Sequence, residues 1–277
     1  MPVDQSSSEL PPIAAPIVTR NLTRRFDGVV AVDRVSLTVE PGELFGLIGS
    51  NGAGKSTLIK MLTTLLPPSE GTAFVAGYDI AREPAEVRRH IGYVPQLLSA
   101  DGSLTGYENM LLSARLYGIP SREREQKIAD ALAALELSNE ADRLVRHYSG
   151  GMIRRLEIAQ SMLHRPSVMF LDEPTVGLDP IARKAVWDHV RMLRDKTETT
   201  ILITTHYMEE AEELCQRIAL MSRGRIAVVG TPVELKSALG PGATMDDVFA
   251  HHTGAELEVE GALGEARRTR LGMRHHG

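Results

Sequence analysis

The sequence predicts an α/β fold: a mostly parallel sheet covered by helices, an antiparallel β portion near the N-terminus, and an inserted block of helices. Two observations support this prediction. Short apolar runs occur at 44–48, 168–171 and 201–204, as is typical of parallel strands that are buried on both faces. Segments of helical periodicity lie between these runs, and the residues from about 97 to 165 have helical character almost throughout.

The first part of the chain alternates between strand signals and one helix. Apolar and β-branched residues, which favour strands, occupy 17–23, 29–39, 44–48, 72–76 and 91–94. Pro41-Gly42 follows the second of these runs and is a turn signal. The segment 55–62 follows a glycine-rich loop and has the composition of a good helix.

The central block carries helix signals. Thr105 and Glu108 have the spacing of a capping box, which starts a helix. Ile128, Leu132 and Leu135 recur at helical spacing and form one apolar stripe. Ser149 is a natural N-cap for the helix that follows, and its apolar positions are 153, 156, 159 and 163.

The α/β pattern resumes after this block. In order, we expect a strand at 168–171, a helix at 181–196, a strand at 201–205, a hairpin of 218–221 with 225–229, and short helices at 232–239 and 245–251. The domain is therefore expected to span 17–253, with a helical subdomain at about 97–165. Residues 1–16 and 254–277 lack periodicity and are expected to form a flexible leader and a flexible tail.

Composition excludes several classes of protein. Thirty-one Lys and Arg against 36 Asp and Glu give a net charge of -5, which argues against a chain whose main task is to coat nucleic acid. A single cysteine, Cys215, excludes an intrachain disulfide and fits a reducing compartment. No apolar run approaches the roughly 18 residues of a membrane-spanning helix, and residues 1–10 lack the pattern of a secretory signal. If the protein works at a membrane, we expect another chain to cross it.

The segment Gly49-Ser-Asn-Gly-Ala-Gly-Lys-Ser56 fits the phosphate-loop pattern G-x-x-x-x-G-K-[ST] and lies between a predicted strand and a predicted helix. Its glycines let backbone N–H groups converge on phosphate oxygens at the positive end of a helix. Lys55 adds a positive charge at the β- and γ-phosphates, and the Ser56 hydroxyl can bind Mg²⁺. The alternative is a glycine-rich turn with an incidental lysine, which the strand–loop–helix context disfavours.

Two acids end the apolar run at 168–171. Asp172 and Glu173 are expected at the carboxyl edge of the sheet, where open α/β folds bind ligands. Because consecutive strand residues point to opposite faces, we expect the two acids to divide the work. Asp172 would hold Mg²⁺ through water and Glu173 would polarise the attacking water. The alternative is a pair of solvated acids at a strand end.

A second helix N-terminus suited to anions occurs at Ser149-Gly-Gly151. The nucleotide phosphates already have such a site before Lys55, so this turn is expected to bind a nucleotide held by a second copy or a paralogue. Taken by itself, a Ser-Gly-Gly turn is more often an ordinary helix start.

Together these motifs resemble the ATP-binding cassette (ABC) ATPases over nearly the whole segment 17–230, in the family's order and spacing. Gln96 resembles the Q-loop glutamine, which meets Mg²⁺ and links the site to the membrane partner. Asp179 resembles the D-loop acid, His206 the switch histidine, and Phe26 an aromatic that stacks on adenine. A core Phe at a strand end would look the same as Phe26.

The resemblance implies a P-loop NTPase core and a set of site residues. The implied ATP contacts are Phe26, Gly49, Ser50, Asn51, Gly52, Ala53, Gly54, Lys55, Ser56, Thr57, Gln96, Ser149, Gly150, Gly151 and Asp179. The implied Mg²⁺ ligands are Ser56, Gln96 and Asp172, and the implied catalytic residues are Lys55, Glu173 and His206.

The signature departs from the common Leu-Ser-Gly-Gly-Gln, because Tyr148 and Met152 flank the Ser-Gly-Gly turn. Loss of the glutamine removes one side-chain amide near the opposing nucleotide and leaves the backbone donors. Tyr-Ser-Gly-Gly-Met followed by Arg154-Arg155 is similar to the daunorubicin-resistance type of exporter. The resemblance implies an ATPase that works as a homodimer or with a paralogue and powers export of a drug-like or lipophilic compound through a separate membrane permease. It also implies a cytoplasmic chain, peripheral on the inner face of the membrane, with no nucleic-acid partner.

Three alternatives stay open. An ABC ATPase can act on nucleic acid or ribosomes, although this chain lacks the coiled-coil insert, cysteine pairs or second cassette of such types. A regulatory nucleotide-binding module that does not hydrolyse ATP is disfavoured by the complete set Asp172, Glu173 and His206. An importer ATPase is also possible in principle, but the residues after about 230 leave little room for the C-terminal regulatory domain of sugar importers, which favours export.

Overall fold

A computed structural model describes residues 15–254 of the chain. The leader and the tail expected at 1–16 and 254–277 fall almost wholly outside the described residues. In chain order the elements are β1 (Ile17–Phe26), β2 (Val29–Val39), β3 (Leu44–Ile48), α1 (Lys55–Leu62), β4 (Glu70–Val75), β5 (Tyr78–Asp79), α2 (Pro84–His90), β6 (Ile91–Val94), α3 (Gly106–Leu116), α4 (Ser121–Ala134), two 3₁₀ turns η1 (Ser138–Glu140) and η2 (Val145–His147), α5 (Gly150–Met162), β7 (Val168–Asp172), α6 (Pro180–Thr197), β8 (Thr200–Thr205), α7 (Met208–Leu214), β9 (Arg217–Ser222), β10 (Arg225–Gly230), α8 (Pro232–Ser237) and α9 (Met245–Thr253).

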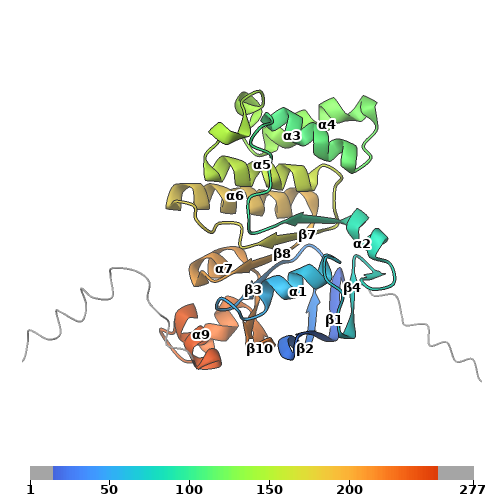
Figure 1. Ribbon diagram of the computed structural model, residues 1–277. Coiled ribbons are helices and arrows are strands. Elements are labelled where there is room, and N and C mark those ends of the chain that lie inside the picture. The colour runs from blue at the N-terminus through green and yellow to red at the C-terminus, as the bar shows by residue number, and fades with distance from the viewer. Residues whose placement is uncertain (1–14, 255–277) are drawn as a thin grey trace, which may run out of the picture.

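Within residues 15–254 the strands form two sheets (Figure 1). The smaller sheet has the order β2-β1-β4-β5 and is antiparallel. The larger sheet has the order β10-β9-β3-β8-β7-β6, in which only β10 runs antiparallel to its neighbour. The predicted α/β fold with an antiparallel portion is therefore confirmed. Because β3, β8 and β7 are parallel neighbours, the loops that follow them meet at one edge.

Burial on both faces explains why the central strands are apolar throughout. In β3, Phe45 and Leu47 pack in a cluster with α1 and the antiparallel sheet, whereas Leu44 and Ile48 pack in a cluster with the helices α5 to α7. Every residue of β3, β7 and β8 is buried. Alternation of polar and apolar residues would leave one of these faces unsatisfied.

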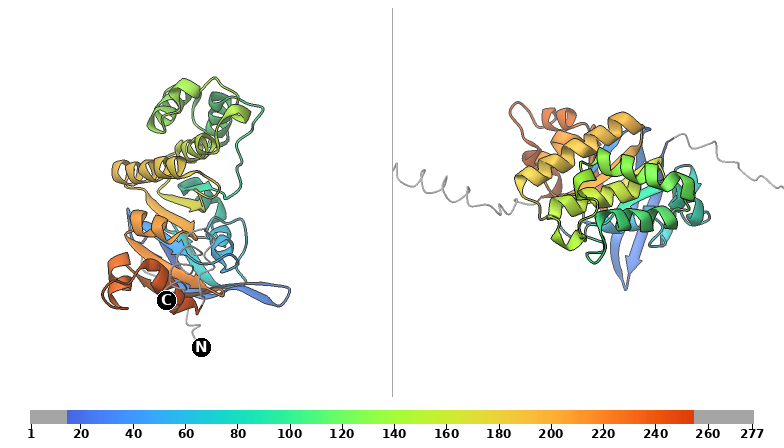
Figure 2. Two further views of the ribbon diagram at one scale, coloured as in Figure 1. Left: turned by 90° about the vertical axis from the view of Figure 1, so that its left-hand side faces the viewer. Right: turned by 90° about the horizontal axis from the view of Figure 1, so that it is seen from above.

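The helices α3, α4 and α5 stack on α6, which covers the sheet (Figures 1 and 2). The predicted capping box starts α3, since the Thr105 hydroxyl accepts from the Glu108 N–H and the Glu108 carboxylate accepts from the Thr105 N–H. Tyr148, which stands in the place of the common signature leucine, donates from its hydroxyl to the Glu140 carbonyl at 2.6 Å. This bond fixes the residues just before α5.

Two short elements, β5 and α2, have no expectation in the sequence, and only the end of α7 falls within a stretch expected to be helix-like, 212–217. Helix α2 begins with Pro84 and buries only Val87, so it has no apolar stripe that a periodicity argument could detect. Helix α7 has seven residues, too few for such a pattern to repeat. No helix within residues 15–254 is long and apolar enough to cross a membrane.

Candidate functional site

The loop between β3 and α1 has the backbone that a phosphate-binding turn requires. Gly54 caps α1 in a left-handed conformation with φ of 110°. A Cβ atom on Gly54 would lie 2.4 Å from the Ala31 carbonyl oxygen, and one on Gly49 would lie 2.4 Å from the Met221 carbonyl oxygen. A side chain is therefore excluded at both ends of the loop, so that its backbone can approach a phosphate closely.

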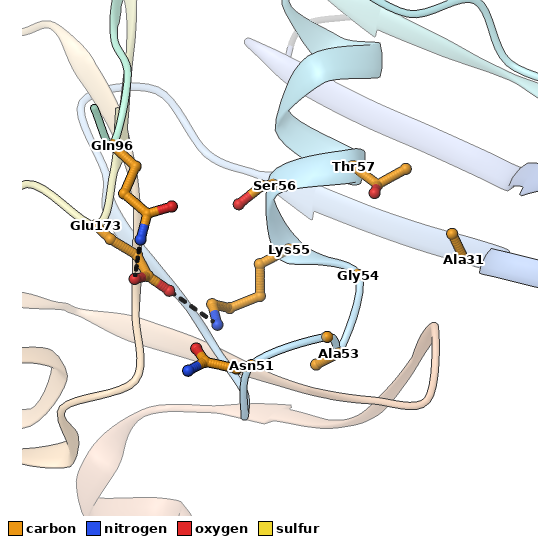
Figure 3. A pocket seen from close by; sticks show the side chains of 10 residues that line it. Ala31, Asn51, Ala53, Gly54, Lys55, Ser56, Thr57, Gln96 and Glu173 are labelled. Atoms are coloured by element: carbon orange, nitrogen blue, oxygen red, sulfur yellow. Dashed lines mark hydrogen bonds and ion pairs between the residues drawn. The ribbon is translucent and has the colours of Figure 1, made fainter. Parts of the chain in front are cut away.

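This loop lines a cavity of about 330 Å³ at the N-terminus of α1 (Figure 3). The cavity is lined by Ala31, Asn51, Gly52, Ala53, Gly54, Lys55, Ser56, Thr57, Gln96 and Glu173. Lys55 Nζ donates to the Gly49 carbonyl at 2.8 Å and lies 3.1 Å from Glu173 Oε1. Both charged side chains are about 95% buried, with 4% and 5% exposed. Unpaired, either would carry a large desolvation cost, so the ion pair holds both in place.

Asp172, which ends β7, and Glu173, which follows it, face the same site, which corrects the expectation that they point to opposite faces. Asp172 Oδ1 accepts from the hydroxyls of Ser56 at 3.2 Å and Thr204 at 2.6 Å. Glu173 has φ of 48°, outside the extended region, so the chain turns immediately after Asp172. The Glu173 N–H donates to the Thr204 carbonyl at 3.1 Å and to its hydroxyl at 3.0 Å, which holds this turn. The alternation rule fails here because Glu173 lies beyond the strand.

Glu173 is the centre of the polar contacts in the pocket. Gln96 Nε2 donates to Glu173 Oε2 at 3.0 Å, while Lys55 lies against the other carboxylate oxygen (Figure 3). His206 Nδ1 is 3.4 Å from Glu173 Oε2 and makes no hydrogen bond. Three of the predicted functional side chains thus converge on one carboxylate. The charge of Asp172 also acts nearby: burial, with that charge adding to it, raises the pKa of Tyr93 to about 12.

The donor set suits a hard divalent cation. Ser56 and Asp172 are hydrogen-bonded to each other, and Figure 3 shows the amide oxygen of Gln96 turned toward Ser56. Hydroxyl, carboxylate and amide oxygens are the ligands that Mg²⁺ prefers. No cluster of three or more His, Cys, Asp or Glu that could hold a metal occurs in residues 15–254, so binding here would need substrate or water oxygens as further ligands.

Other predicted contacts lie outside the lining of this pocket. Ser149 and Gly150 are exposed at the start of α5, where the Ser149 hydroxyl accepts from the Met152 N–H at 3.3 Å, as expected of the N-cap. Asp179 is exposed and caps α6 through bonds from the N–H groups of 181 and 182. Phe26 ends β1, is 40% exposed and lies under the Arg24 guanidinium. Their contacts with a nucleotide stay predictions.

Sequence reasoning missed two residues of the site. Ala31 contributes to the lining of the pocket and its carbonyl packs against Gly54. Thr204 bonds Asp172 and the backbone of Glu173. Thr204 had a signal, because a polar residue near the carboxyl end of a buried parallel strand faces the ligand edge. Ala31 had none, since its part in the pocket depends on how β2 packs against the loop.

A buried carboxyl group supports the loop after Glu173 from behind. Glu210 on α7 has no exposed surface, and its Oε1 accepts from the Thr175 hydroxyl and the Trp187 indole, both at 2.8 Å. Its other oxygen, Oε2, has no hydrogen-bond partner. Burial raises the pKa of Glu210, against the hydrogen bonds it accepts, which lower it.

This raised pKa predicts a stability effect. Between the ordinary pKa of the group and its raised pKa in the folded state, the folded chain binds more protons than the unfolded chain, so the contribution of Glu210 to stability is lost as the pH rises through that window. Glu210→Gln removes the titration. We therefore expect the melting temperature of the variant to rise relative to that of the wild type as the pH is raised above 4.5, the ordinary pKa of the group. Glu209→Gln, an exposed neighbour, should leave the difference independent of pH. Parallel curves for wild type and Glu210→Gln would contradict the prediction.

The site combines a glycine-rich loop at a helix N-terminus, a buried lysine and two acids at a sheet edge. This combination defines a site for the phosphates of a nucleoside triphosphate. Residues 32–176 match the ABC transporter family. The chain is 47% identical over 224 residues to the daunorubicin/doxorubicin resistance ATP-binding protein DrrA of Streptomyces peucetius. This match covers 81% of this chain and 68% of that protein. The chain is 42% identical over 233 residues to the human phospholipid-transporting ATPase ABCA3, covering 83% of this chain and 14% of that protein. A solved structure described as the ATP binding subunit of an ABC transporter has a TM-score of 0.75 at 30% identity, over 85% of this chain and 98% of that one.

This chain belongs to the ABC transporter family, as one of its ATP-binding, ATP-hydrolysing subunits. The resemblance drawn from the motifs is thereby confirmed, as is the P-loop ABC ATPase fold. ABC ATPases dimerise and pair with membrane-spanning subunits. The chain spans only a small part of ABCA3, so nothing about that whole protein follows from this match.

Proposed function

We propose that this chain powers export of a drug-like or lipophilic compound through a separate membrane permease, by closing on a second cassette with ATP between them. The observation that carries the proposal is the convergence of Lys55, Gln96 and His206 on the buried Glu173. The exposed Ser149 and Gly150 support it, because they leave a second anion-binding turn accessible to a neighbour. The second cassette is another copy of this chain or a paralogue.

Each group then has a role in the closed pair. Backbone N–H groups from Gly49 to Thr57 and the Lys55 ammonium hold the phosphates, and Phe26 stacks on adenine. Ser56, Asp172 and Gln96 hold Mg²⁺, which neutralises phosphate charge. Ser149, Gly150, Gly151 and Asp179 act on the nucleotide across the interface.

The contact between Lys55 and Glu173 suggests how ATP binding makes the Glu173 carboxylate available as the general base. Lys55 is paired with Glu173 Oε1 at 3.1 Å. When a phosphate of ATP binds the Lys55 ammonium, it replaces Glu173 Oε1 as the partner of that ammonium. Glu173 can then accept a proton from the attacking water, while Gln96 still donates to its other oxygen at 3.0 Å. His206, at 3.4 Å from that oxygen, then contacts the γ-phosphate. ATP can drive the permease only through its higher affinity for the closed arrangement.

Export is proposed over the alternatives from the relatives. Streptomyces peucetius DrrA is named for daunorubicin and doxorubicin resistance, and Burkholderia thailandensis has a relative named for Nod factor export. Neither name points to nucleic acid or ribosomes. The proposed location is the cytoplasmic face of the cell membrane, where ATP and the permease are both accessible, and no nucleic-acid partner is proposed.

The test is stimulation of the ATPase by candidate partners. We expect steady-state phosphate release to rise when the chain is reconstituted with a candidate multi-helix membrane permease, and inside-out vesicles to accumulate doxorubicin only with ATP. Glu173→Gln, in the same vesicles, should abolish accumulation. Stimulation by DNA or ribosomes with no response to the membrane protein would overturn the transport role. Loss of doxorubicin from preloaded inside-out vesicles would indicate import instead.

A further inference from the structure

A buried ion pair on α5 holds the segment that carries Gln96. Arg154 and Glu157 lie one helical turn apart, with 2.9 Å between Arg154 Nη1 and Glu157 Oε2. Only 2% of each side chain is exposed. Residues this polar are almost never buried unless they are paired and hydrogen-bonded, so their further partners indicate what they do.

Those partners all lie in the segment 95–100. Arg154 donates from Nη1 to the Pro95 carbonyl at 2.6 Å and from Nη2 to the Gln96 carbonyl at 2.7 Å. Glu157 Oε1 accepts from the Ser99 N–H, from the Ser99 hydroxyl at 3.0 Å and from the Ala100 N–H at 3.3 Å. The arginine therefore anchors the first half of the segment and the glutamate anchors the second half.

Between these two anchors the segment is open to solvent. Leu97 and Leu98 are 81% and 50% exposed. Neither leucine belongs to an apolar cluster, so the charged pair supplies hydrogen bonds that attach the segment on both sides of them. A buried ion pair is weak evidence for stability, because desolvation can cost as much as the attraction returns. The hydrogen bonds that Arg154 and Glu157 make to the backbone indicate instead that the pair holds the segment 95–100 in position.

The two ends of this connection both belong to the proposed catalytic cycle. The anchored backbone places the Gln96 side chain on Glu173, at 3.0 Å. The anchoring helix α5 begins at the Ser149-Gly-Gly turn, of which Ser149 and Gly150 are exposed. A displacement of α5 would therefore move the carbonyl of Gln96 with it, because Arg154 is rigidly forked onto that carbonyl and its neighbour.

We propose that Arg154 and Glu157 are positioning residues, which lock the Gln96 segment to α5 so that docking of the Ser149 turn on a neighbour's nucleotide sets Gln96 against Glu173. This inference rests on the proposed closure of two cassettes. Neither side chain touches the nucleotide site; they act through the backbone of 95–100.

The first test separates anchoring from ion pairing. Arg154→Lys keeps the charge but cannot reach both carbonyls in a planar fork. We expect kcat for ATP to fall by up to about a hundredfold with KM nearly unchanged. The charge-reversed double variant, Arg154→Glu with Glu157→Arg, restores opposite charges but sets a carboxylate against carbonyls and a guanidinium against N–H groups. We expect no rescue, and a return of kcat to the wild-type value would overturn the proposal.

The second test does not depend on turnover. Hydrogen exchange of the peptide covering 95–101 should accelerate at least about tenfold in Arg154→Met with Glu157→Leu, since the Ser99 and Ala100 amides lose their acceptor. Apolar replacement of a buried pair is often neutral for stability, so exchange in α5 and the melting temperature should change little. Unchanged exchange at 95–101 would overturn the proposal even if the double variant were inactive.

Arg155→Gln is the matched control. Arg155 lies on the same helix and also bonds a backbone carbonyl, that of Leu135 at 3.1 Å, but makes no hydrogen bond or ion pair with 95–100. It should leave kcat and the exchange of 95–101 at wild-type values. A lower kcat together with faster exchange of 95–101 in this control would show that any change of charge on α5 disturbs the segment, which contradicts specific anchoring. Failure of the two-cassette model is distinguishable, because the hydrolysis-deficient Glu173→Gln would then form no ATP-dependent dimer while the exchange result stood.

Discussion

Glu173→Gln is expected to stop ATP hydrolysis while leaving ATP bound, so that ATP-loaded dimers accumulate. Among the described residues that line the pocket, Glu173 carries the one carboxylate, with Lys55 on one oxygen and Gln96 on the other. A glutamine keeps the shape but cannot take the proton. Loss of a positioned base costs about 10²- to 10⁴-fold in rate. Phosphate release and size-exclusion chromatography with ATP measure the two effects.

Two comparisons make the Glu173 result interpretable. Glu209→Gln removes an exposed acid after His206 and should hydrolyse ATP at the wild-type rate. Glu173→Gln should also show a melting temperature that rises with ATP, because bound ligand stabilises the folded state. If Glu173→Gln stays monomeric with ATP and still hydrolyses it, Glu173 is not the base.

The second large effect is complementation between two inactive variants. Lys55→Ala removes the buried ammonium that is expected to bind the phosphates and should abolish tight ATP binding or turnover. Ser149→Arg places a long cation on the exposed turn that is expected to contact a neighbour's nucleotide. Each variant alone should be inactive. A mixed dimer joins the intact loop of the Ser149→Arg chain to the intact turn of the Lys55→Ala chain, so it retains one complete site.

The expected size of this recovery follows from symmetry. In an equal mixture half of the dimers are mixed and each keeps one of its two sites, so phosphate release can return to about a quarter of the wild-type rate. Ser138→Arg, at an exposed serine of the same helical block, should be fully active by itself. A mixture with no more activity than its two components would contradict a nucleotide shared between subunits. Normal turnover by Lys55→Ala would remove the phosphate loop from the mechanism.

Local signals in the sequence predicted most of the elements that carry the site. Helix α1 has the predicted bounds, and strands β3 and β6 do as well, because unbroken apolar runs and a glycine loop are strong local signals. The N-caps Thr105 and Ser149 make the bonds that their residue types favour. Helix α2 had no such signal, since it buries a single residue. Local chemistry specifies an element only where its pattern repeats.

For the residues of the site, too, local motifs were predictive and contacts between distant segments were not. Lys55, Asp172, Gln96 and His206 were predicted from motifs, and the structure brings all four to the loop edge around Glu173. The direction of Glu173 was predicted wrongly, because its left-handed backbone is imposed by the neighbouring strand at Thr204. The alternation of side chains along a strand does not extend past its last residue.

The sequence by itself determined that this chain has a phosphate-binding loop, two acids at the end of a buried strand and a Ser-Gly-Gly helix start, because each is a run of adjacent residues whose chemistry is local. Only the tertiary structure decided which groups meet across long separations. Thr204 holds the turn at Glu173, Glu210 supports the loop behind it, and Arg154 with Glu157 holds the Gln96 segment on α5. Such contacts depend on how strands and helices pack. A buried polar group must be hydrogen-bonded, but which group bonds it is decided by the packing of elements that are distant in the sequence.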